Sequence, residues 1–285
     1  MSQALNKTGR NISFMCNFPW SFWGMDTDPA DGGVWVSEFC NSWRVAGDPQ
    51  PGFENALGYV ASVEKYADAV PSKPGAWATL DAIEIGNSGS FDVLYDGAAE
   101  GGQRQALRVG GGAMTPAQEI AAISLYMLVK TPIFIGADVT KLEGHSLEAF
   151  LNKDLISIHQ DPLGAQGRRL RADGDTEVWG CALSGSRHAA VLLNKGGAAV
   201  SINVTWAELD RLSGGTPPEC SSQSSVAAAD SRAVFDVWEH KTLGSFDGGF
   251  EAGSVDAMSV VVVVVSPAPR GRAQQLGSWA TADFA

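Results

Sequence analysis

The pattern of expected secondary structure changes near residue 165, and this change constrains the fold more than any other feature of the chain. Before it, strand-like apolar runs at 12–16, 82–85 and 133–135 alternate with segments of helical periodicity at 53–70 and 115–129. Strands that alternate with helices are typical of βαβ units, which build a parallel sheet with helices on its faces. The sequence therefore predicts an α/β region over residues 1–165.

After residue 165 the chain carries strand-like runs with no helical segments between them. Short strands that follow one another in this way are typical of an antiparallel β-sandwich. Six consecutive valines indicate a central strand, because the same run at a sheet edge would favour aggregation. The sequence predicts an antiparallel β-sandwich over residues 166–268, with strands at 176–182, 187–193, 199–204, 234–238 and 259–266.

Three segments follow neither pattern. Residues 88–111 lie in a glycine-rich stretch of little periodicity, which predicts a loop inserted into the α/β region. Residues 214–230 are rich in Ser, Pro and Ala and predict a second loop, while residues 269–285 predict a disordered tail.

The helix after the insertion has a clear expected start, with Thr115 as N-cap, Pro116 at the first helical position and Gln118 three residues after the cap.

The excess of acidic over basic side chains excludes two classes of binding partner. The 285 residues include 32 acidic and 20 basic side chains, which gives a net charge of -12. Nucleic acids and anionic membranes bind clustered Lys and Arg, so neither is expected as a partner.

Residues 1–11 are polar and lack the apolar core of a signal peptide, so the location in the cell is left open. The cysteine and histidine spacings of zinc sites are missing from the sequence, so no metal or cofactor is expected.

The candidate chemistry lies just after residue 40, where Arg44 stands four residues before Asp48. A carboxyl group that protonates a departing oxygen is a working part of glycoside hydrolysis, and Asp48 is the candidate for that role. On spacing alone such a pair is more typical of a surface salt bridge. Asp81 and Glu84, beside a short predicted strand, are weaker candidates on the same grounds.

Many separate segments resemble the alpha-galactosidases of glycoside hydrolase family 27, the melibiase group. The similarity is collinear from residue 4 to about residue 266, and many motifs in the same order are more specific than any one alone. In the first region the matching residues are 4–5, 8–10, 41–44, Asp48, Trp77, Asp81, 85–87, 114–115, 135–136, 138–139 and 152–154. They continue at 160–164, 166–167, 177–179, 183–185 and 238–241.

The resemblance implies a fold, an activity and a site. The family has a (β/α)8 barrel followed by an antiparallel β-sandwich, and it removes terminal α-D-galactosyl residues by a retaining mechanism. By resemblance, Asp48 is the general acid/base, Arg44 contacts both the sugar and that carboxylate, and Asp81 lines the pocket. Cys16 and Cys40 match a disulfide near the pocket.

The resemblance also assigns specificity positions. Asn17, Trp20 and Ser21 fall where the family reads the sugar 2-position, and Asn17 replaces a Glu that is typical of galactose-specific members. Cys181 and Cys220 have no counterpart and are candidates for free thiols.

The chain departs from the family at the nucleophile. That residue is the Asp of a Lys-Tyr-Asp motif upstream of the segment that matches residue 4, and this chain holds no match to it. Residues 78–82 stand where the family has Asn-Asp-Pro-Asp-Met, so that Asp81 is the one carboxylate retained of two. We therefore expect the C-terminal half of a (β/α)8 TIM barrel, with its last four strands, in a truncated enzyme of negligible activity by itself.

Two alternatives to an alpha-galactosidase stay open. The chain could be a non-catalytic, carbohydrate-binding pseudoenzyme, or a family member that acts on α-N-acetylgalactosaminides or β-L-arabinopyranosides. In each case the expected ligand is a galactoside or a related sugar. An open half barrel also predicts a homo-oligomer or a complementing N-terminal fragment, because it leaves two sheet edges uncovered. The family is typically secreted, vacuolar or lysosomal.

Overall fold

The computed structural model describes residues 1–17, 36–68, 70–87, 91–95, 105–109, 113–213 and 231–268. Trp20, Ser21 and Cys220 lie outside these residues, as do the segments 214–230 and 269–285 for which the sequence predicts a loop and a tail. No helix of the described residues has both the length and the apolar character needed to cross a membrane.

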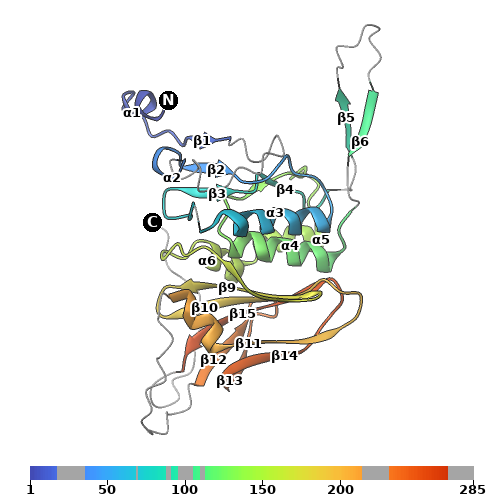
Figure 1. The fold of residues 1–285 in the computed structure, drawn as a ribbon. Coiled ribbons are helices and arrows are strands. Elements are labelled where there is room, and N and C mark those ends of the chain that lie inside the picture. Colours follow the sequence, from blue (N-terminus) through green and yellow to red (C-terminus); the bar gives the residue numbers. More distant parts are fainter. Residues whose placement is uncertain are drawn as a thin grey trace.

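The first region contains short parallel strands backed by helices (Figure 1). β1 pairs in parallel with β2, and β2 with β3, so that Arg44 lies opposite Thr79. β4 pairs in parallel with β7. The strands are β1 (Met15–Cys16), β2 (Ser42–Arg44), β3 (Trp77–Thr79), β4 (Ala82–Ile83) and β7 (Phe134–Ile135). The helices are α1 (Ser2–Asn6), α2 (Val36–Phe39), α3 (Phe53–Tyr66), α4 (Pro116–Leu128), α5 (Gly144–Leu151) and α6 (Lys153–His159).

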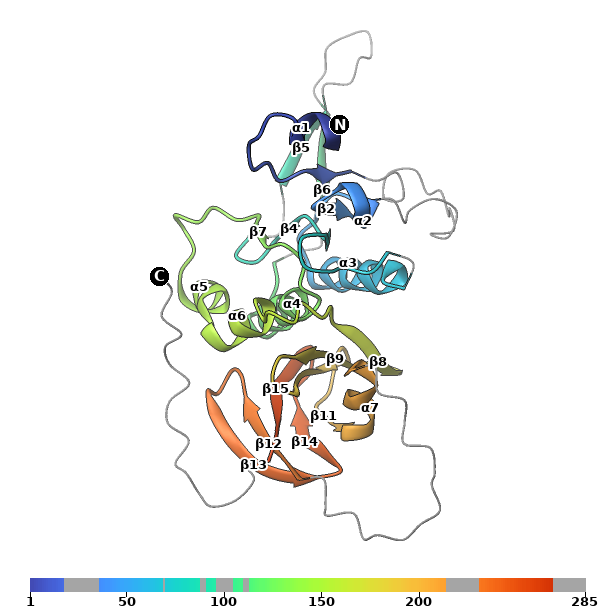
Figure 2. The same ribbon diagram turned by 90° about the vertical axis from the view of Figure 1, so that its left-hand side faces the viewer.

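Helix α4 begins as its sequence predicts. The Thr115 side chain accepts a hydrogen bond from the Gln118 backbone N–H, and the Gln118 side chain accepts one from the Thr115 N–H, which completes a capping box. Pro116 occupies the first turn, where its missing N–H costs no helical hydrogen bond. Every residue from Ala121 to Leu128 is buried, because α4 lies between the parallel strands and the second region (Figure 2).

The second region is an antiparallel sandwich. One sheet has the strand order β13-β12-β15-β10-β9-β8, and β11 pairs with β14 to form the other. The run of valines forms β15 between β10 and β12, so the prediction of a central strand is confirmed. The strands are β8 (Arg168–Asp173), β9 (Thr176–Leu183), β10 (Arg187–Asn194), β11 (Val200–Thr205), β12 (Ser231–Asp236), β13 (Lys241–Asp247), β14 (Gly249–Val255) and β15 (Ser259–Pro267), with the short helix α7 (Trp206–Asp210) after β11.

The larger sheet is covered on both faces, which explains why residues 189–193 of β10 and 260–265 of β15 are all apolar. In β10, Ala189, Val191 and Leu193 belong to a core shared with α4 and α6. The alternate residues Ala190 and Leu192 belong to a second core shared with β11 and β14. Successive side chains of a strand point to opposite faces, so each strand contributes to both cores.

The inserted segment differs from its prediction. Residues 88–111 were expected to form a loop, but they contain the antiparallel hairpin β5 (Phe91–Tyr95) and β6 (Gln105–Val109), with Phe91 opposite Val109. The two strands project away from the rest of the molecule in Figure 1. Each strand is only five residues long, and the many glycines of the segment leave no clear periodicity in its sequence.

Gly58 offers a test of the packing around α3. It lies inside this helix, and a Cβ added there would meet no atom within 4 Å. Gly58→Ala is therefore expected to raise the free energy of unfolding by about 0.5–1 kcal/mol, because alanine loses less backbone entropy on folding. Urea unfolding measures this change. The control is Gly75→Ala, which has equal space but a φ of +86° and should destabilise the protein. A loss of stability in Gly58→Ala would contradict the described helix.

Candidate active site

Arg44 joins two carboxylates that come from different strand ends. Its Nη2 donates a hydrogen bond to Asp48 Oδ1 at 3.0 Å, and its Nη1 lies 3.2 Å from Asp81 Oδ2. The Arg44 side chain is 10% exposed, whereas that of Asp48 is 72% exposed. Arg44 ends β2 and Asp81 follows β3, the neighbouring parallel strand. The three charged groups therefore meet at the carboxyl end of the sheet, where barrel enzymes hold their active sites.

The backbone at Asp81 adopts an unusual conformation that fixes its carboxylate. Its φ is 64°, in the left-handed region that Asp enters more readily than most residues. The Asp81 N–H donates to Thr79 Oγ1 at 3.1 Å, and the neighbouring Leu80 N–H donates to Thr131 Oγ1 at 3.0 Å. These hydrogen bonds hold the turn between β3 and β4 and direct Asp81 toward Arg44.

The loop that carries Asp48 is anchored through its backbone. The Tyr59 hydroxyl donates a hydrogen bond to the Asp48 carbonyl oxygen at 2.8 Å. Burial of the phenol raises the pKa of Tyr59, and the negative charge of Asp48 adds to this rise, so Tyr59 remains a donor at neutral pH. The main chain of Asp48 is thus fixed by α3, while among the described residues its side chain is bound by Arg44 alone.

Glu84 is a third carboxylate at this end of the sheet. Burial raises its pKa, and the nearby charge of Asp81 adds to the rise, although a hydrogen bond from the Asn87 side chain opposes it. A Cβ at Gly136, just after β7, would lie 2.5 Å from Glu84 Oε1, so the carboxylate packs against bare backbone. Glu84 therefore lies where the ends of β4 and β7 meet.

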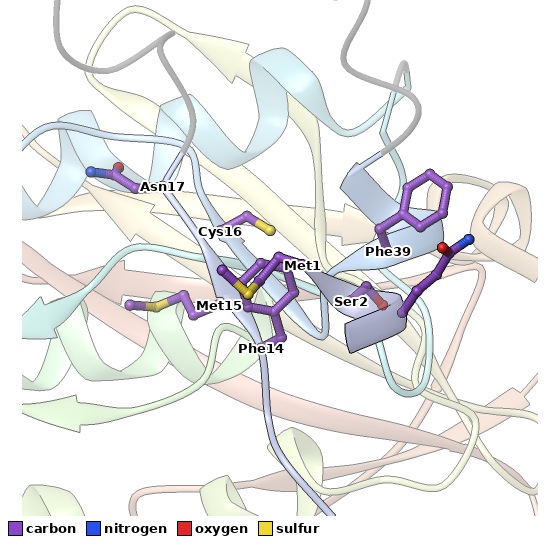
Figure 3. A pocket seen from close by; sticks show the side chains of 8 residues that line it. Met1, Ser2, Phe14, Met15, Cys16, Asn17 and Phe39 are labelled. Atoms are coloured by element: carbon purple, nitrogen blue, oxygen red, sulfur yellow. The ribbon is translucent and has the colours of Figure 1, made fainter. Parts of the chain in front are cut away.

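The predicted disulfide between Cys16 and Cys40 is present. It ties the end of β1 to the residue that follows α2. Next to it, Asn17 borders an open groove of about 500 Å³, formed with residues of α1, β1 and α2 (Figure 3). Arg44, Asp48 and Asp81 do not line this groove. Asn17 directly follows Cys16, which lies opposite Trp43, so it is placed beside the end of β2 that carries Arg44.

Cys181 is a buried free thiol, and burial raises its pKa to about 11. Within the ranges that the structure describes, no group of three or more His, Cys, Asp or Glu side chains is arranged to hold a metal ion.

Two family models match the chain. One, described as alpha galactosidase A, matches residues 1–94, and the other, described as the alpha galactosidase C-terminal beta sandwich domain, matches residues 173–265. Alpha-galactosidase 2 of Arabidopsis thaliana is 30% identical over 85% of this chain and 49% of its own length. The alpha-galactosidase of Coffea arabica is 31% identical over 94% of this chain and 57% of its own length.

Solved structures agree with these sequence matches. Alpha-galactosidase I from Mortierella vinacea superimposes with a TM-score of 0.66 at 25% identity, covering 93% of this chain and 61% of its own. This chain thus spans about half the length of the curated relatives that it matches. Its parallel strands form the C-terminal half of a (β/α)8 barrel, followed by the antiparallel sandwich. The chain belongs to the alpha-galactosidase (melibiase) family, glycoside hydrolase family 27, and corresponds to the C-terminal portion of its members.

Proposed function

We propose that this chain supplies the proton-donor side of an alpha-galactosidase active site that cleaves terminal α-D-galactosyl residues with retention of configuration. The observation that supports this most is the meeting of Arg44, Asp48 and Asp81 at the carboxyl end of parallel strands. In this proposal Asp48 gives its proton to the departing glycosidic oxygen and later takes one from water. Arg44 and Asp81 hold the sugar, and Arg44 also orients Asp48.

A retaining mechanism needs a second carboxylate about 5–5.5 Å from the first, to attack the anomeric carbon. Asp81 does not suit that role, because it shares the Arg44 guanidinium with Asp48 and has its own place in the pocket by resemblance. No residue of the chain matches the nucleophile motif of the family. The nucleophile is therefore proposed to come from a polypeptide segment other than these 285 residues, which a second copy of the chain cannot supply.

The proton donor is also poorly held in the described structure. An ion pair with one partner as exposed as Asp48 contributes about 0.2–1 kcal/mol, which restricts the side chain only weakly. Catalytic groups work best when surrounding structure fixes them and excludes water. Asp48 thus needs further enclosure before it can act as an efficient acid.

The purified chain alone is expected to hydrolyse aryl α-galactosides at least about 10⁴-fold more slowly than a complete retaining enzyme, because loss of a covalent nucleophile leaves only binding and weak acid assistance. A chromogenic aryl α-galactoside measures this rate, with Asp48→Asn as the matched control. Turnover in the unaltered chain that Asp48→Asn abolishes would refute the expectation. Equal background rates in both would support it.

A second candidate function is galactoside binding without turnover. It is favoured by the retention of Arg44 and Asp81 in a chain with no match to the nucleophile. Titration calorimetry with galactose, N-acetylgalactosamine and L-arabinose would measure this binding and compare the sugars. We propose that Asn17, Trp20 and Ser21 set this preference at the sugar 2-position. Binding that survives Arg44→Met would argue against the charged cluster as the binding site.

We also propose an oxidising compartment for the chain, secreted, vacuolar or lysosomal as is typical of the family. The Cys16–Cys40 disulfide supports this location, because such bonds persist where thiols are not kept reduced.

A further inference from the structure

The smaller sheet of the sandwich carries a sequence motif that the proposed function does not use. Asn203, Val204 and Thr205 form an Asn-x-Thr triplet whose middle residue is not proline, which is the acceptor pattern for an N-linked glycan. The triplet ends β11, which pairs with β14. Such triplets often occur by chance, so the position of Asn203 in the fold decides whether it can carry a glycan.

The side chain of Asn203 points away from the core. Along β11, Ile202 and Val204 are 5% and 0% exposed and pack in the core shared with the larger sheet, whereas Asn203 between them is exposed. Successive side chains of a strand point to opposite faces, so Asn203 lies on the outer face of the smaller sheet. A bulky, hydrophilic group attached there displaces no buried side chain.

Arg171 leaves the nitrogen of the Asn203 amide available. Its Nη2 donates a hydrogen bond to Asn203 Oδ1 at 3.1 Å and another to the Asn203 carbonyl oxygen. Arg171 Nη1 also lies 3.3 Å from Glu208 Oε1, which holds the guanidinium in place. Because a guanidinium only donates, the amide atom beside it must be the oxygen. Nδ2, the atom that would carry a glycan, makes no hydrogen bond within the described residues.

We propose that Asn203 is a site of N-linked glycosylation. The inference rests on the proposed secretory location of the chain and not on sugar turnover. In the reaction, Asn203 Nδ2 attacks the anomeric carbon of an oligosaccharide that is carried on a lipid diphosphate. The new C–N bond replaces the C–O bond to the diphosphate, the lipid diphosphate leaves, and Nδ2 loses one proton. The product keeps the amide oxygen to which Arg171 donates.

The threonine of the triplet places the transfer before folding. In the folded chain the Thr205 hydroxyl donates to Glu208 Oε2 at 2.9 Å and accepts from the Glu208 N–H at 3.2 Å, as part of the capping box of α7. The acceptor pattern requires a hydroxyl at this position, and here it is already occupied. We therefore expect the glycan to be added before β11 pairs with β14, and then to remain on the outer face.

A glycan at Asn203 lies far from the charged cluster. The six-stranded sheet and α4 lie between the smaller sheet and the parallel strands beside Arg44, Asp48 and Asp81 (Figures 1 and 2). The modified and unmodified chains should therefore bind galactosides equally well.

Mass spectrometry of the full chain, secreted from a eukaryotic cell line behind an added signal peptide, tests the proposal. Peptide-N-glycosidase treatment in heavy-oxygen water should convert Asn203 to a labelled aspartate in most molecules. Asn203→Gln should remove the mass of one glycan from the intact protein. The matched control is Thr205→Ser, which keeps both the acceptor hydroxyl and the helix cap and should keep the glycan.

Two other triplets of the same pattern begin at Asn6 and Asn11, which are also exposed and report whether the chain met the glycosylating enzyme. Label at Asn6 or Asn11 with an unlabelled Asn203 would overturn the site, as would a secreted chain that is unlabelled at every triplet. An intact mass that Asn203→Gln leaves unchanged would also overturn it. The added signal peptide delivers the chain whatever its native location, so the site and the proposed location can fail separately.

Discussion

Asp161→Ala is expected to lower the free energy of unfolding by about 3 kcal/mol, as removal of one partner from a buried charged network does. Asp161 is buried where the barrel region meets the sandwich. Its carboxylate accepts hydrogen bonds from the Ser184 N–H at 2.9 Å, the Ser184 hydroxyl at 2.8 Å and the Leu163 N–H at 3.0 Å. Arg187 Nη2 lies 3.2 Å away. The substitution leaves these donors without their acceptor.

The same residue predicts a pH dependence. Burial alone would raise the pKa of Asp161, but hydrogen bonds from Ser184 and Leu163 and the positive charge of Lys130 outweigh it and hold the pKa below its ordinary value. A depressed folded pKa means that the ionised carboxylate stabilises the fold above its unfolded pKa of about 4. This contribution is lost as the pH falls from about 4 through the folded pKa.

Urea unfolding at pH 7, 5 and 3 measures both effects. The difference between the unaltered chain and Asp161→Ala should be full at pH 7 and 5 and shrink at pH 3. The matched control is Asp68→Ala, since Asp68 pairs with Arg168 at 2.6 Å but is 95% exposed, and its removal should cost less than about 1 kcal/mol. Equal losses in the two variants would contradict the described network.

Gly167→Ala is expected to lower the free energy of unfolding by about 2–3 kcal/mol, because the new methyl group has no room. A Cβ at Gly167 would lie 2.6 Å from the Leu128 carbonyl oxygen, which is backbone and cannot rotate away. The Gly167 N–H also donates to that oxygen at 3.0 Å, so separating the two segments breaks a hydrogen bond at the end of α4.

The control for this steric effect is Gly253→Ala in β14, where an added Cβ meets nothing within 4 Å. That variant should be neutral or slightly more stable in the same urea titration. A Gly167→Ala protein as stable as Gly253→Ala would mean that the chain does not approach α4 as described.

Three of the sandwich strands that the sequence predicts, β9, β10 and β15, are rich in apolar residues because side chains on both of their faces are largely buried. The strands that it missed carry a different signal. β8 contains Arg168, Arg169 and Arg171, whose charges are neutralised by acidic partners from elsewhere in the chain. β13 and β14 are interrupted by glycines and half exposed. Hydrophobic periodicity could not find strands stabilised by ion pairs and sheet pairing.

The candidate site was predictable residue by residue but not as a cluster. The family motifs pointed to Arg44, Asp48 and Asp81 separately. That Arg44 reaches Asp81 depends on the parallel register that places Arg44 opposite Thr79, and on the left-handed turn at Asp81. Neither can be read from spacing, because both arise from pairing between segments that are distant in the chain. Burial raises the pKa of Glu84, and the nearby charge of Asp81 adds to this rise.

The apolar core beneath the six-stranded sheet determines how the two regions of this molecule unfold. Trp179, Cys181 and Val191 face α4 and α6 in one continuous apolar cluster. Proteolytic cleavage near residue 165, followed by separation of the two fragments, would expose an apolar surface on each of them. The change in secondary-structure pattern near residue 165 is therefore not a boundary between two independently stable units. Calorimetry on the intact chain should record one melting transition for both regions.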